Sequence, residues 1–277
     1  MRIIAAIALT ITANFAFADC AARRAPVAGH YAPVNGVQMY YEIHGVSDGK
    51  TPPLVLIHGG GSSIDTSFGT SLGPLSQRRQ VIAFDQRGHG RTADIIDHPF
   101  SFDESGEDAV ALLQFLKIDR ADFLGYSNGG NIAQLIAIKH PKVVRKLILQ
   151  STFFKRDAFA PEFWEGMRHA SLATMPAELK EAYTKVAPHP EQLQMLHDKS
   201  VKRMLEYKDM PVESIHAISA PTLILNADGD VIRPEHAVEM WRTIPHAELA
   251  IIPGSDHMKM TTCNDTQLSI IDNFLRR

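Results

Sequence analysis

The chain has 277 residues, of which 45% are hydrophobic and 21% charged, and its formal net charge is −3. This length and composition predict a soluble globular protein with one large core and room for an inserted subdomain. A net charge so near zero provides no basic surplus for nucleic acid or anionic lipid, so we expect a small-molecule partner and no nucleic acid.

The first eighteen residues have the pattern of a secretory signal peptide. Arg2 supplies a positive start, residues 3–11 form an apolar centre, and Ala-Phe-Ala at 16–18 is a small-x-small cleavage site. The apolar stretch is short and interrupted by polar residues, which disfavours a permanent membrane span. We therefore expect an exported protein, periplasmic or secreted, whose mature chain starts near Asp19 and has no membrane span.

The chain contains two cysteines, Cys20 and Cys263. Export would permit a disulfide between them, but the sequence leaves open whether it forms. Asp19 directly before Cys20 disfavours lipid attachment there, and neither cysteine lies in a signature for a cysteine nucleophile.

Strand patterns begin with a hairpin and continue as buried runs. Asn35-Gly36 between two apolar segments predicts a β-hairpin. Beyond residue 53, continuous apolar runs alternate with helical patterns, which is typical of a mostly parallel sheet covered by helices on both faces. The expected buried strands are residues 54–57, 80–84, 122–124, 146–149, 222–225 and 248–252.

Helical patterns separate these runs. Ser101 and Glu104 form a capping box, followed by an apolar face at 109, 112, 113 and 116. Two further helices are expected over residues 131–140 and 265–275. Residues 152–210 hold helical segments interrupted by prolines, and a structureless loop of that length is improbable in a compact domain. We expect a helical cap, 152–210, inserted into an α/β core of residues 19–151 and 211–277, with some of its aromatic residues and methionines lining an apolar pocket.

Residues 125–130 read GYSNGG, a serine with a glycine two positions away on each side. This spacing, between an apolar run and a helical pattern, is typical of a nucleophile elbow. On such a turn the serine takes a strained backbone conformation, and nearby glycines avoid collisions. We expect Ser127 to be the nucleophile, provided that partners for it exist, since short matches of this kind also arise by chance.

Two downstream segments supply candidate partners for Ser127. A serine hydroxyl attacks effectively when an imidazole takes its proton and a carboxylate orients that imidazole. The predicted strand 222–225 leads into Asp228 and Asp230, and strand 248–252 leads toward His257. The carboxyl ends of parallel strands meet at one edge of the sheet. We therefore expect His257 to be the base and one of the two aspartates to orient it.

A glycine-rich segment, HGGG at residues 58–61, follows the first predicted buried strand. Glycines let backbone N–H groups face the negative oxygen of a tetrahedral intermediate. We assign Gly60 and Asn128 as oxyanion donors, with Gly61 as the alternative to Gly60. A phosphate-binding loop is disfavoured, because the lysine and the serine or threonine of that motif are missing.

Five segments match the motifs of one known family: HGGG at 58–61, FDQRGHGRT at 84–92, GYSNGG at 125–130, APTLILNADGDVIRPEH at 220–236 and PGSDH at 253–257. Together they resemble the α/β-hydrolase family. The resemblance spans about residues 34–275 and implies an eight-stranded sheet with a helical cap. It favours Asp230 over Asp228 as the acid, and it implies structural roles for Arg87 and His89.

These features predict a serine hydrolase of a small carboxylic ester, lactone or similar acyl substrate, acting through Ser127, His257 and Asp230 with no metal and no cofactor. Relatives that open epoxides or displace halide have aspartate at the position of Ser127, so those chemistries are disfavoured. Two alternatives stay open: a hydrolase of carbon–carbon bonds in ring-cleavage-type diketones, and a non-catalytic ligand-binding member of the fold.

Overall fold

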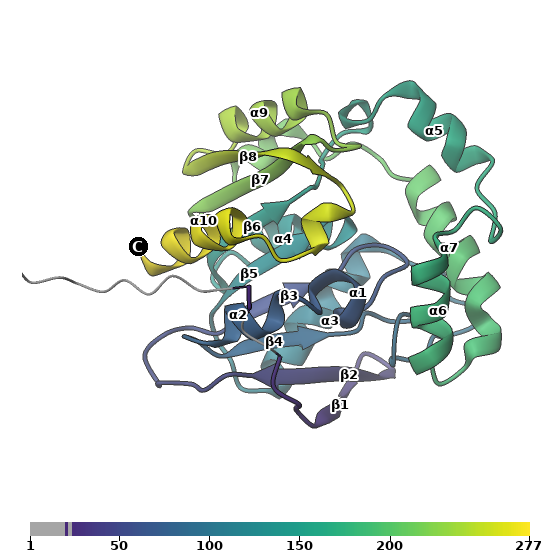
Figure 1. The fold of residues 1–277 in the computed structure, drawn as a ribbon, viewed down its shortest axis with the longest axis horizontal. Helices are drawn as coiled ribbons and strands as arrows, with labels where there is room; N and C mark the ends of the chain where they lie inside the picture. Colours follow the sequence, from purple (N-terminus) through teal and green to yellow (C-terminus); the bar gives the residue numbers. More distant parts are fainter. Residues whose placement is uncertain (1–19, 22–23) are drawn as a thin grey trace, which may run out of the picture.

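The computed structural model of the protein describes residues 20–21 and 24–277, and the predicted signal peptide lies outside these residues. Eight strands form one sheet in the order β1-β2-β4-β3-β5-β6-β7-β8 (Figure 1). The strands are β1 (Gly29–Val34), β2 (Val37–His44), β3 (Leu54–Ile57), β4 (Val81–Phe84), β5 (Ala121–Tyr126), β6 (Val144–Gln150), β7 (Thr222–Gly229) and β8 (Ala247–Asp256).

The sheet is mostly parallel, as predicted. Strands β1 and β2 form an antiparallel hairpin, β2 pairs antiparallel with β4, and every other neighbouring pair is parallel. The hairpin turns at Asn35 and Gly36, whose φ angles are 41° and 88°. Positive φ at both central residues is the requirement of a tight turn that matches the twist of the strands, which explains the Asn-Gly pair.

Helices cover both faces of the sheet. The core on one face includes α1, α2 and α10, and the core on the other face includes α3, α4, α8 and α9. The helices are α1 (Ile64–Phe68), α2 (Leu72–Ser76), α3 (Phe102–Phe115), α4 (Asn128–Lys139), α5 (Pro161–Arg168), α6 (Ala177–Val186), α7 (Leu193–Leu205), α8 (Val212–His216), α9 (Pro234–Thr243) and α10 (Asp265–Arg276).

The burial of β3 shows why its sequence is continuously apolar. Leu54 and Leu56 belong to one core, and Val55 and Ile57 belong to the core on the opposite face. Side chains of a strand alternate between faces, so a strand covered on both sides needs apolar residues throughout. This pattern explains why the central strands could be recognised without any alternation of polar and apolar residues.

Strands β7 and β8 extend beyond their predicted ends, so the two segments expected to be loops are partly strand. Pairing continues past a register shift to Gly229 and Asp256. The Asp228 carboxylate accepts hydrogen bonds from the backbone N–H groups of Gly254 and Ser255, at 2.9 and 3.2 Å. These contacts hold the two extensions together although neither carries a strand pattern.

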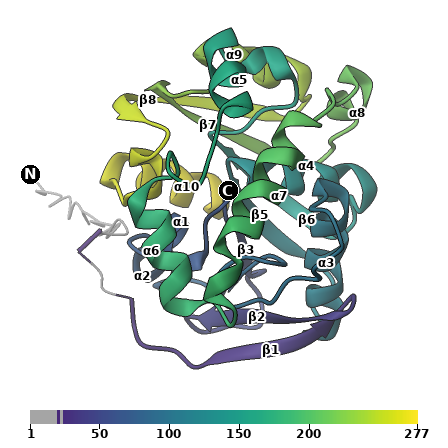
Figure 2. The same cartoon turned by 90° about the vertical axis from the view of Figure 1, so that its right-hand side faces the viewer.

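Three helices, α5, α6 and α7, stand apart from the two helix layers beside the sheet (Figures 1 and 2). They lie between β6 and β7 in the sequence, within the predicted cap. Two prolines of this region mark helix starts: Pro161 is the first residue of α5, and Pro176 directly precedes α6. A proline suits the first turn of a helix, where its missing N–H would have had no partner.

A disulfide joins Cys20 to Cys263, so the pairing that the sequence left open is formed in this structure. It connects the segment before β1 to the segment between β8 and α10. Within residues 20–21 and 24–277, no helix has both the length and the apolar character needed to cross a membrane.

Candidate active site

Ser127 occupies the sharp turn between β5 and α4, with φ of 52° and ψ of −121°. The turn leaves no room for side chains at its glycines. A Cβ on Gly129 would lie 2.0 Å from the carbonyl oxygen of Ile57, and one on Gly125 would lie 2.3 Å from the carbonyl oxygen of Gly129. The strained serine is therefore held by close packing of backbone on backbone. Helix α4 begins at Asn128, three residues earlier than predicted.

The structure brings Ser127, His257 and Asp230 together. The Ser127 hydroxyl lies 3.1 Å from Nε2 of His257, and Nδ1 of His257 lies 2.7 Å from Oδ1 of Asp230. An ionised carboxylate can only accept, so Nδ1 carries a proton and donates it, which leaves Nε2 free to accept from the serine hydroxyl. The arrangement can transfer a proton from Ser127 to His257.

Asp230 is held by more than the histidine. Its carboxylate accepts from the hydroxyl of Ser151 at 2.6 Å and from the backbone N–H of Ile232 at 3.0 Å, and its side chain is fully buried. Burial alone would raise the pKa of Asp230, but the hydrogen bonds from His257, Ile232 and Ser151 hold it below its usual value. Asp230 therefore stays ionised in a buried position.

Ser151 was not among the residues predicted from the sequence. It directly follows β6 and has a positive φ of 51°. Its place after a parallel strand puts it at the same edge as Ser127, which is the signal that could have found it.

Asp228, the other candidate acid, has a different environment. Its side chain binds the N–H groups of β8, and these backbone hydrogen bonds lower its pKa. The Asp228 residue is exposed, whereas the side chain of Asp230 is buried and contacts His257. The geometry therefore gives Asp228 a role in strand pairing.

Tyr126 packs against His257. The two rings lie 5.1 Å apart between centroids, and the tyrosine hydroxyl donates to the backbone carbonyl of His257 at 2.8 Å. Burial raises the pKa of Tyr126 well above its usual value. Tyr126 thus stays neutral and fixes both the ring and the backbone of the histidine from the strand that leads into Ser127.

The glycine segment after β3 rests on a buried histidine. Nδ1 of His58 donates to the carbonyl of Gly59 at 2.8 Å, and its Nε2 accepts the backbone N–H of Gln86 at 3.0 Å. Burial lowers the pKa of His58 to about 4, so it is neutral at pH 7. Gly60, Gly61, Ser127 and Asn128 line one common cavity. The choice between Gly60 and Gly61 as oxyanion donor stays a prediction.

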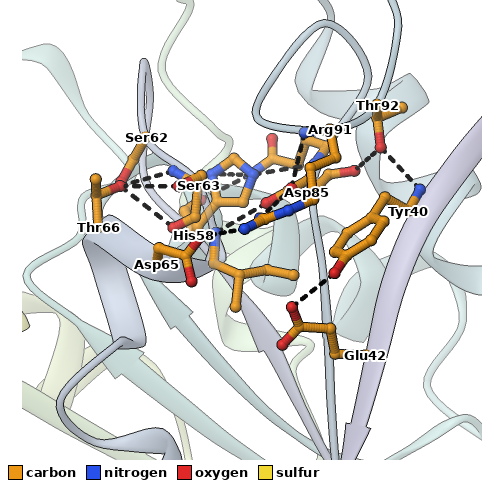
Figure 3. A network of polar contacts seen from close by, with 12 residues as sticks. Tyr40, Glu42, His58, Ser62, Ser63, Asp65, Thr66, Asp85, Arg91 and Thr92 are labelled. Atoms are coloured by element: carbon orange, nitrogen blue, oxygen red, sulfur yellow. Dashed lines mark hydrogen bonds and ion pairs between the residues drawn. The ribbon is translucent and has the colours of Figure 1, made fainter. Parts of the chain in front are cut away.

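A network of charged and polar residues includes His58 and Ser62, which flank the glycines (Figure 3). The buried Asp85 carboxylate accepts from the N–H of Ile64, at the start of α1, and from the backbone and side chain of Arg91. Arg91 also pairs with Asp65 at 2.5 Å. Thr92 accepts from the N–H of Tyr40 and donates to the backbone carbonyl of Asp85. These contacts tie β2, α1 and the segment after β4 into one rigid support.

Arg87 and His89, whose roles the family resemblance implied to be structural, contact other parts of the core. Arg87 donates hydrogen bonds from Nε and Nη2 to the Asp108 carboxylate of α3, at 3.2 and 3.1 Å. The His89 ring lies 5.3 Å from His58 and 5.0 Å from Phe100, between centroids.

The cavity above Ser127 has a volume of about 280 Å³ and is predominantly apolar. The sequence could not show which cap residues line the pocket, and the lining of this cavity identifies them. The cap residues that line it are Phe163, Met167, Ala170, Thr174, Met175, Pro176, Leu179, His197, Ser200, Val201 and Met204. A pocket of this size and character suits a small, largely apolar substrate.

One group of side chains in the described part of the chain is close enough to hold a metal: Asp157, His236 and Glu239. Nε2 of His236 accepts the N–H of Phe154, so Nδ1 carries the proton and faces Glu239 at 3.2 Å. Glu239 also pairs with Lys155. Of the two carboxylates in this group, that of Glu239 is therefore already paired, with Lys155 and His236.

Comparisons with known proteins agree with this architecture. A family model for the alpha/beta hydrolase fold matches residues 52–181. The enol-lactonase from Burkholderia xenovorans LB400, a solved structure, superposes with a TM-score of 0.72 at 22% identity, covering 89% of this chain and 100% of its own. That likeness shows the fold.

Two relatives are similar in sequence. The serine hydrolase BPHL of Homo sapiens is 26% identical over 261 residues, which cover 88% of this chain and 84% of BPHL. The 2-hydroxymuconate semialdehyde hydrolase of a Pseudomonas species (strain CF600) is 36% identical over 102 residues, 36% of each chain.

Proposed function

We propose that this chain, which belongs to the α/β-hydrolase fold family, is a serine hydrolase of small carboxylic esters, lactones or similar acyl compounds. Ser127 is the nucleophile, His257 the general base and then acid, and Asp230 the group that orients His257. The oxyanion donors are the N–H groups of Asn128 and of Gly60, with Gly61 as the alternative.

The observation that carries the proposal is the hydrogen-bonded chain from Ser127 through His257 to Asp230, at 3.1 and 2.7 Å. These distances lie within the range for a nucleophile, its base and an orienting carboxylate. Roles as a surface histidine and a turn-capping aspartate would not account for the hydrogen bonds of His257 with Asp230 and with a strained serine that lines an apolar cavity.

The reaction proceeds in two steps. Oγ of Ser127 attacks the carbonyl carbon while its proton passes to Nε2 of His257, and the oxyanion forms. The carbon–oxygen bond then breaks, and His257 returns the proton to the leaving alcohol. Water then attacks the acyl-enzyme and gives a proton to His257. The bond between Oγ of Ser127 and the acyl carbon breaks, His257 returns that proton to Oγ, and the acid leaves. Every bond change is balanced by a proton that moves between Ser127, His257 and the substrate.

A second candidate is carbon–carbon bond hydrolysis of ring-cleavage-type diketones. The local match to 2-hydroxymuconate semialdehyde hydrolase supports it, but that match spans only 36% of the chain. We prefer ester hydrolysis, because it requires only the hydrogen-bonded Ser127, His257 and Asp230 and the apolar cavity. Turnover of a vinylogous diketone without turnover of short esters would favour the second candidate.

We also propose that the protein is exported, periplasmic or secreted. The predicted signal peptide and the disulfide between Cys20 and Cys263 support this, since disulfides persist in oxidising compartments. The mass of protein purified from its native host should correspond to a chain that starts near Asp19. Recovery of the chain with Met1 in place would contradict export by this route.

The experiment for the catalytic proposal is hydrolysis of p-nitrophenyl esters by the wild type and by Ser127→Ala. The wild type should show a burst of about one p-nitrophenol per active site where deacylation is slow. Ser127→Ala should lose at least about 10³-fold in kcat while unfolding at the same urea concentration. Equal activity of the two proteins would overturn the assignment, and inactivity of both toward all esters, lactones and diketones would favour the non-catalytic alternative.

A further inference from the structure

Arg203, on cap helix α7, is a buried cation without a partner. Its side chain belongs to a residue only 5% exposed, and its Nε and Nη2 atoms are buried and make no hydrogen bond with the described residues. No carboxylate pairs with it in this part of the chain, and burial lowers its pKa to about 10. The guanidinium is therefore charged at pH 7. The faces of Phe102 and Phe100 lie 4.7 and 5.5 Å from its central carbon.

Two other arginines of this chain show what the same pair of nitrogens does. Arg145 donates through Nε and Nη2 to the two oxygens of Asp122, and Arg87 donates through Nε and Nη2 to Asp108. Both use the side-on edge of the guanidinium, which matches the two oxygens of a carboxylate. In Arg203 the same edge, Nε and Nη2, is buried and has no hydrogen-bond acceptor in the described part of the chain. The comparison indicates that a carboxylate is the missing partner.

Asp103 and Glu206 line a neighbouring cavity together with Arg203, but their printed ion pairs are with Lys139 and Lys202, and within the described residues neither pairs with Arg203. Its core-side neighbours include His58 and His89, whose pKa values are lowered first by burial and, among other causes, by the positive charge of Arg203. The residues that line the cavity above Ser127 include no aspartate and no glutamate. A buried unpaired cation is destabilising, so a bound anion here would be stabilised strongly.

Arg203 lines a neighbouring cavity, and its Nη2 atom lies close to the wall of the cavity above Ser127. Nη2 is 3.7 Å from the position that a Cβ would take on Gly60, and the side-chain amide nitrogen of Asn128 is 2.4 Å from the same position. Gly60 and Asn128 both line the cavity. On α7, Ser200 and Met204 also line it, and the Ser200 hydroxyl is buried without a partner. Ser200 and Arg203 are three residues apart and so share one face of the helix.

We propose that Arg203, with the Ser200 hydroxyl beside it, binds a carboxylate of the substrate, so that the preferred substrates are esters or lactones whose acyl part carries a carboxylate. This inference rests on the proposed function, because it names the substrate class of the Ser127 site. The apolar cap residues contact the carbon chain, and the Arg203 edge fixes the end of it. The scissile carbonyl is thereby oriented toward Ser127 by two points of attachment.

The test compares two esters that differ only in charge. Mono-p-nitrophenyl glutarate carries a carboxylate where p-nitrophenyl valerate has its terminal methyl group. The ratio of their kcat/KM values is measured for the wild type, Arg203→Gln, Arg203→Lys and Lys208→Gln. Lys208 lines a neighbouring cavity together with Arg203 and is exposed, so its substitution removes the same charge without touching the Arg203 edge.

The wild type should prefer the glutarate ester. Arg203→Gln should reduce the glutarate-to-valerate ratio about 10- to 100-fold, mainly through KM, as expected for loss of charge-assisted hydrogen bonds. Arg203→Lys should retain part of the ratio, because it keeps the charge and loses the fork. Lys208→Gln should leave the ratio within about 2-fold, since exposed charges are screened.

Two results would overturn the inference while leaving the proposed function intact. One is a wild type that hydrolyses the valerate ester through Ser127 and discriminates against the glutarate ester, a result that holds even if Arg203→Gln does not fold. The other is an equal loss on both esters in the Arg203 variants, which would assign Arg203 to the oxyanion or to cap packing. Absence of Ser127-dependent turnover for both esters and for the longer and shorter dicarboxylic monoesters would overturn the proposed function and this inference together.

Discussion

Asp230 at the sheet edge and Arg203 in the cap are both buried charged groups, but only Asp230 has hydrogen-bonded charge partners within the described residues. At the sheet edge, Asp230 has three hydrogen-bond donors, and Asp85 beneath the glycine segment has the N–H of Ile64 and both the backbone and the side chain of Arg91. On the cap side, Nε and Nη2 of the buried Arg203 have no hydrogen-bond acceptor among the described residues. Buried polar groups are normally paired. The paired Asp230 can hold His257 in place, whereas the unpaired Arg203 is available to bind a ligand. We therefore expect the core to carry the proposed chemistry and the cap to select the substrate.

The largest expected effect breaks the catalytic chain at the sheet edge. Asp230→Asn should lower kcat by about 10⁴-fold, because an amide at this position favours the wrong tautomer of His257. Asp228→Asn is the matched control, since Asp228 lies two residues away and binds backbone N–H groups of β8. Ester hydrolysis by the two variants provides the measurement. Comparable activity losses in both would remove the distinction between the two aspartates.

The next effect tests whether the charged network beneath the glycine segment is a support. Asp85→Asn should lower the free energy of unfolding by about 3 kcal/mol, because it leaves the buried end of Arg91 and two backbone N–H groups poorly paired. Asp65→Asn removes another carboxylate partner of Arg91, one that is a third exposed, and should cost less than about 1 kcal/mol. Urea unfolding of both variants measures the difference, and equal costs would contradict the role given to burial.

Acid pH should weaken the same support through His58. The folded-state pKa of His58 is about 4, below the value of about 6.5 expected in the unfolded chain, so the unfolded state binds the proton more readily. Stability is therefore unaffected by His58 above pH 6.5 and falls as the pH drops from 6.5 toward 4. The His58 contribution to this loss should be about 2 kcal/mol at pH 5 relative to pH 7.5, and burial, which raises the pKa of Asp85 to about 6, opposes it over the same range.

His58→Gln provides the control for this pH dependence. It should be less stable than the wild type at pH 7.5 but should lose less stability between pH 7.5 and pH 5. Urea unfolding at the two pH values measures this. A variant with the same pH dependence as the wild type would show that His58 titrates normally in the folded protein.

The smallest effect concerns the cap. Met175 is half-buried, lines the cavity and has its methyl carbon 3.6 Å from the Cβ position of Gly61. Met175→Ala should change the stability by less than about 1 kcal/mol and shift the preference among acyl-chain lengths about 5- to 10-fold toward longer chains, by enlarging the pocket. The kcat/KM values for a series of p-nitrophenyl esters measure the shift. An unchanged chain-length profile would separate the cap from substrate selection.

Much of the fold could be predicted because its signals are local. The runs at 54–57 and 80–84 agree with β3 and β4 to within one residue, since a strand buried on both faces must be apolar throughout. The extensions of β7 and β8 could not be predicted in this way. They depend on Asp228 bonding to N–H groups 26 and 27 residues away, a tertiary contact with no local pattern.

In the candidate site, too, the residues with local sequence signals were predicted and those without such signals were missed. Ser127 has a local signature, and chain order selects His257 and the aspartate region, so Ser127, His257 and Asp230, which the structure brings together, were named in advance. Their catalytic roles stay predictions. Ser151 and Arg203 were missed, because a serine after a strand and an arginine on a largely polar helix look ordinary until the fold shows what surrounds them.

The most direct test of the account is to trap the covalent intermediate. The purified protein is treated with a fluorophosphonate, and the modified peptide is identified by mass spectrometry, with Ser127→Ala as the comparison. The account predicts one adduct per chain, on Ser127, and none on Ser127→Ala. An adduct on another residue, or an unchanged yield in Ser127→Ala, would contradict the claim that Ser127 is the nucleophile.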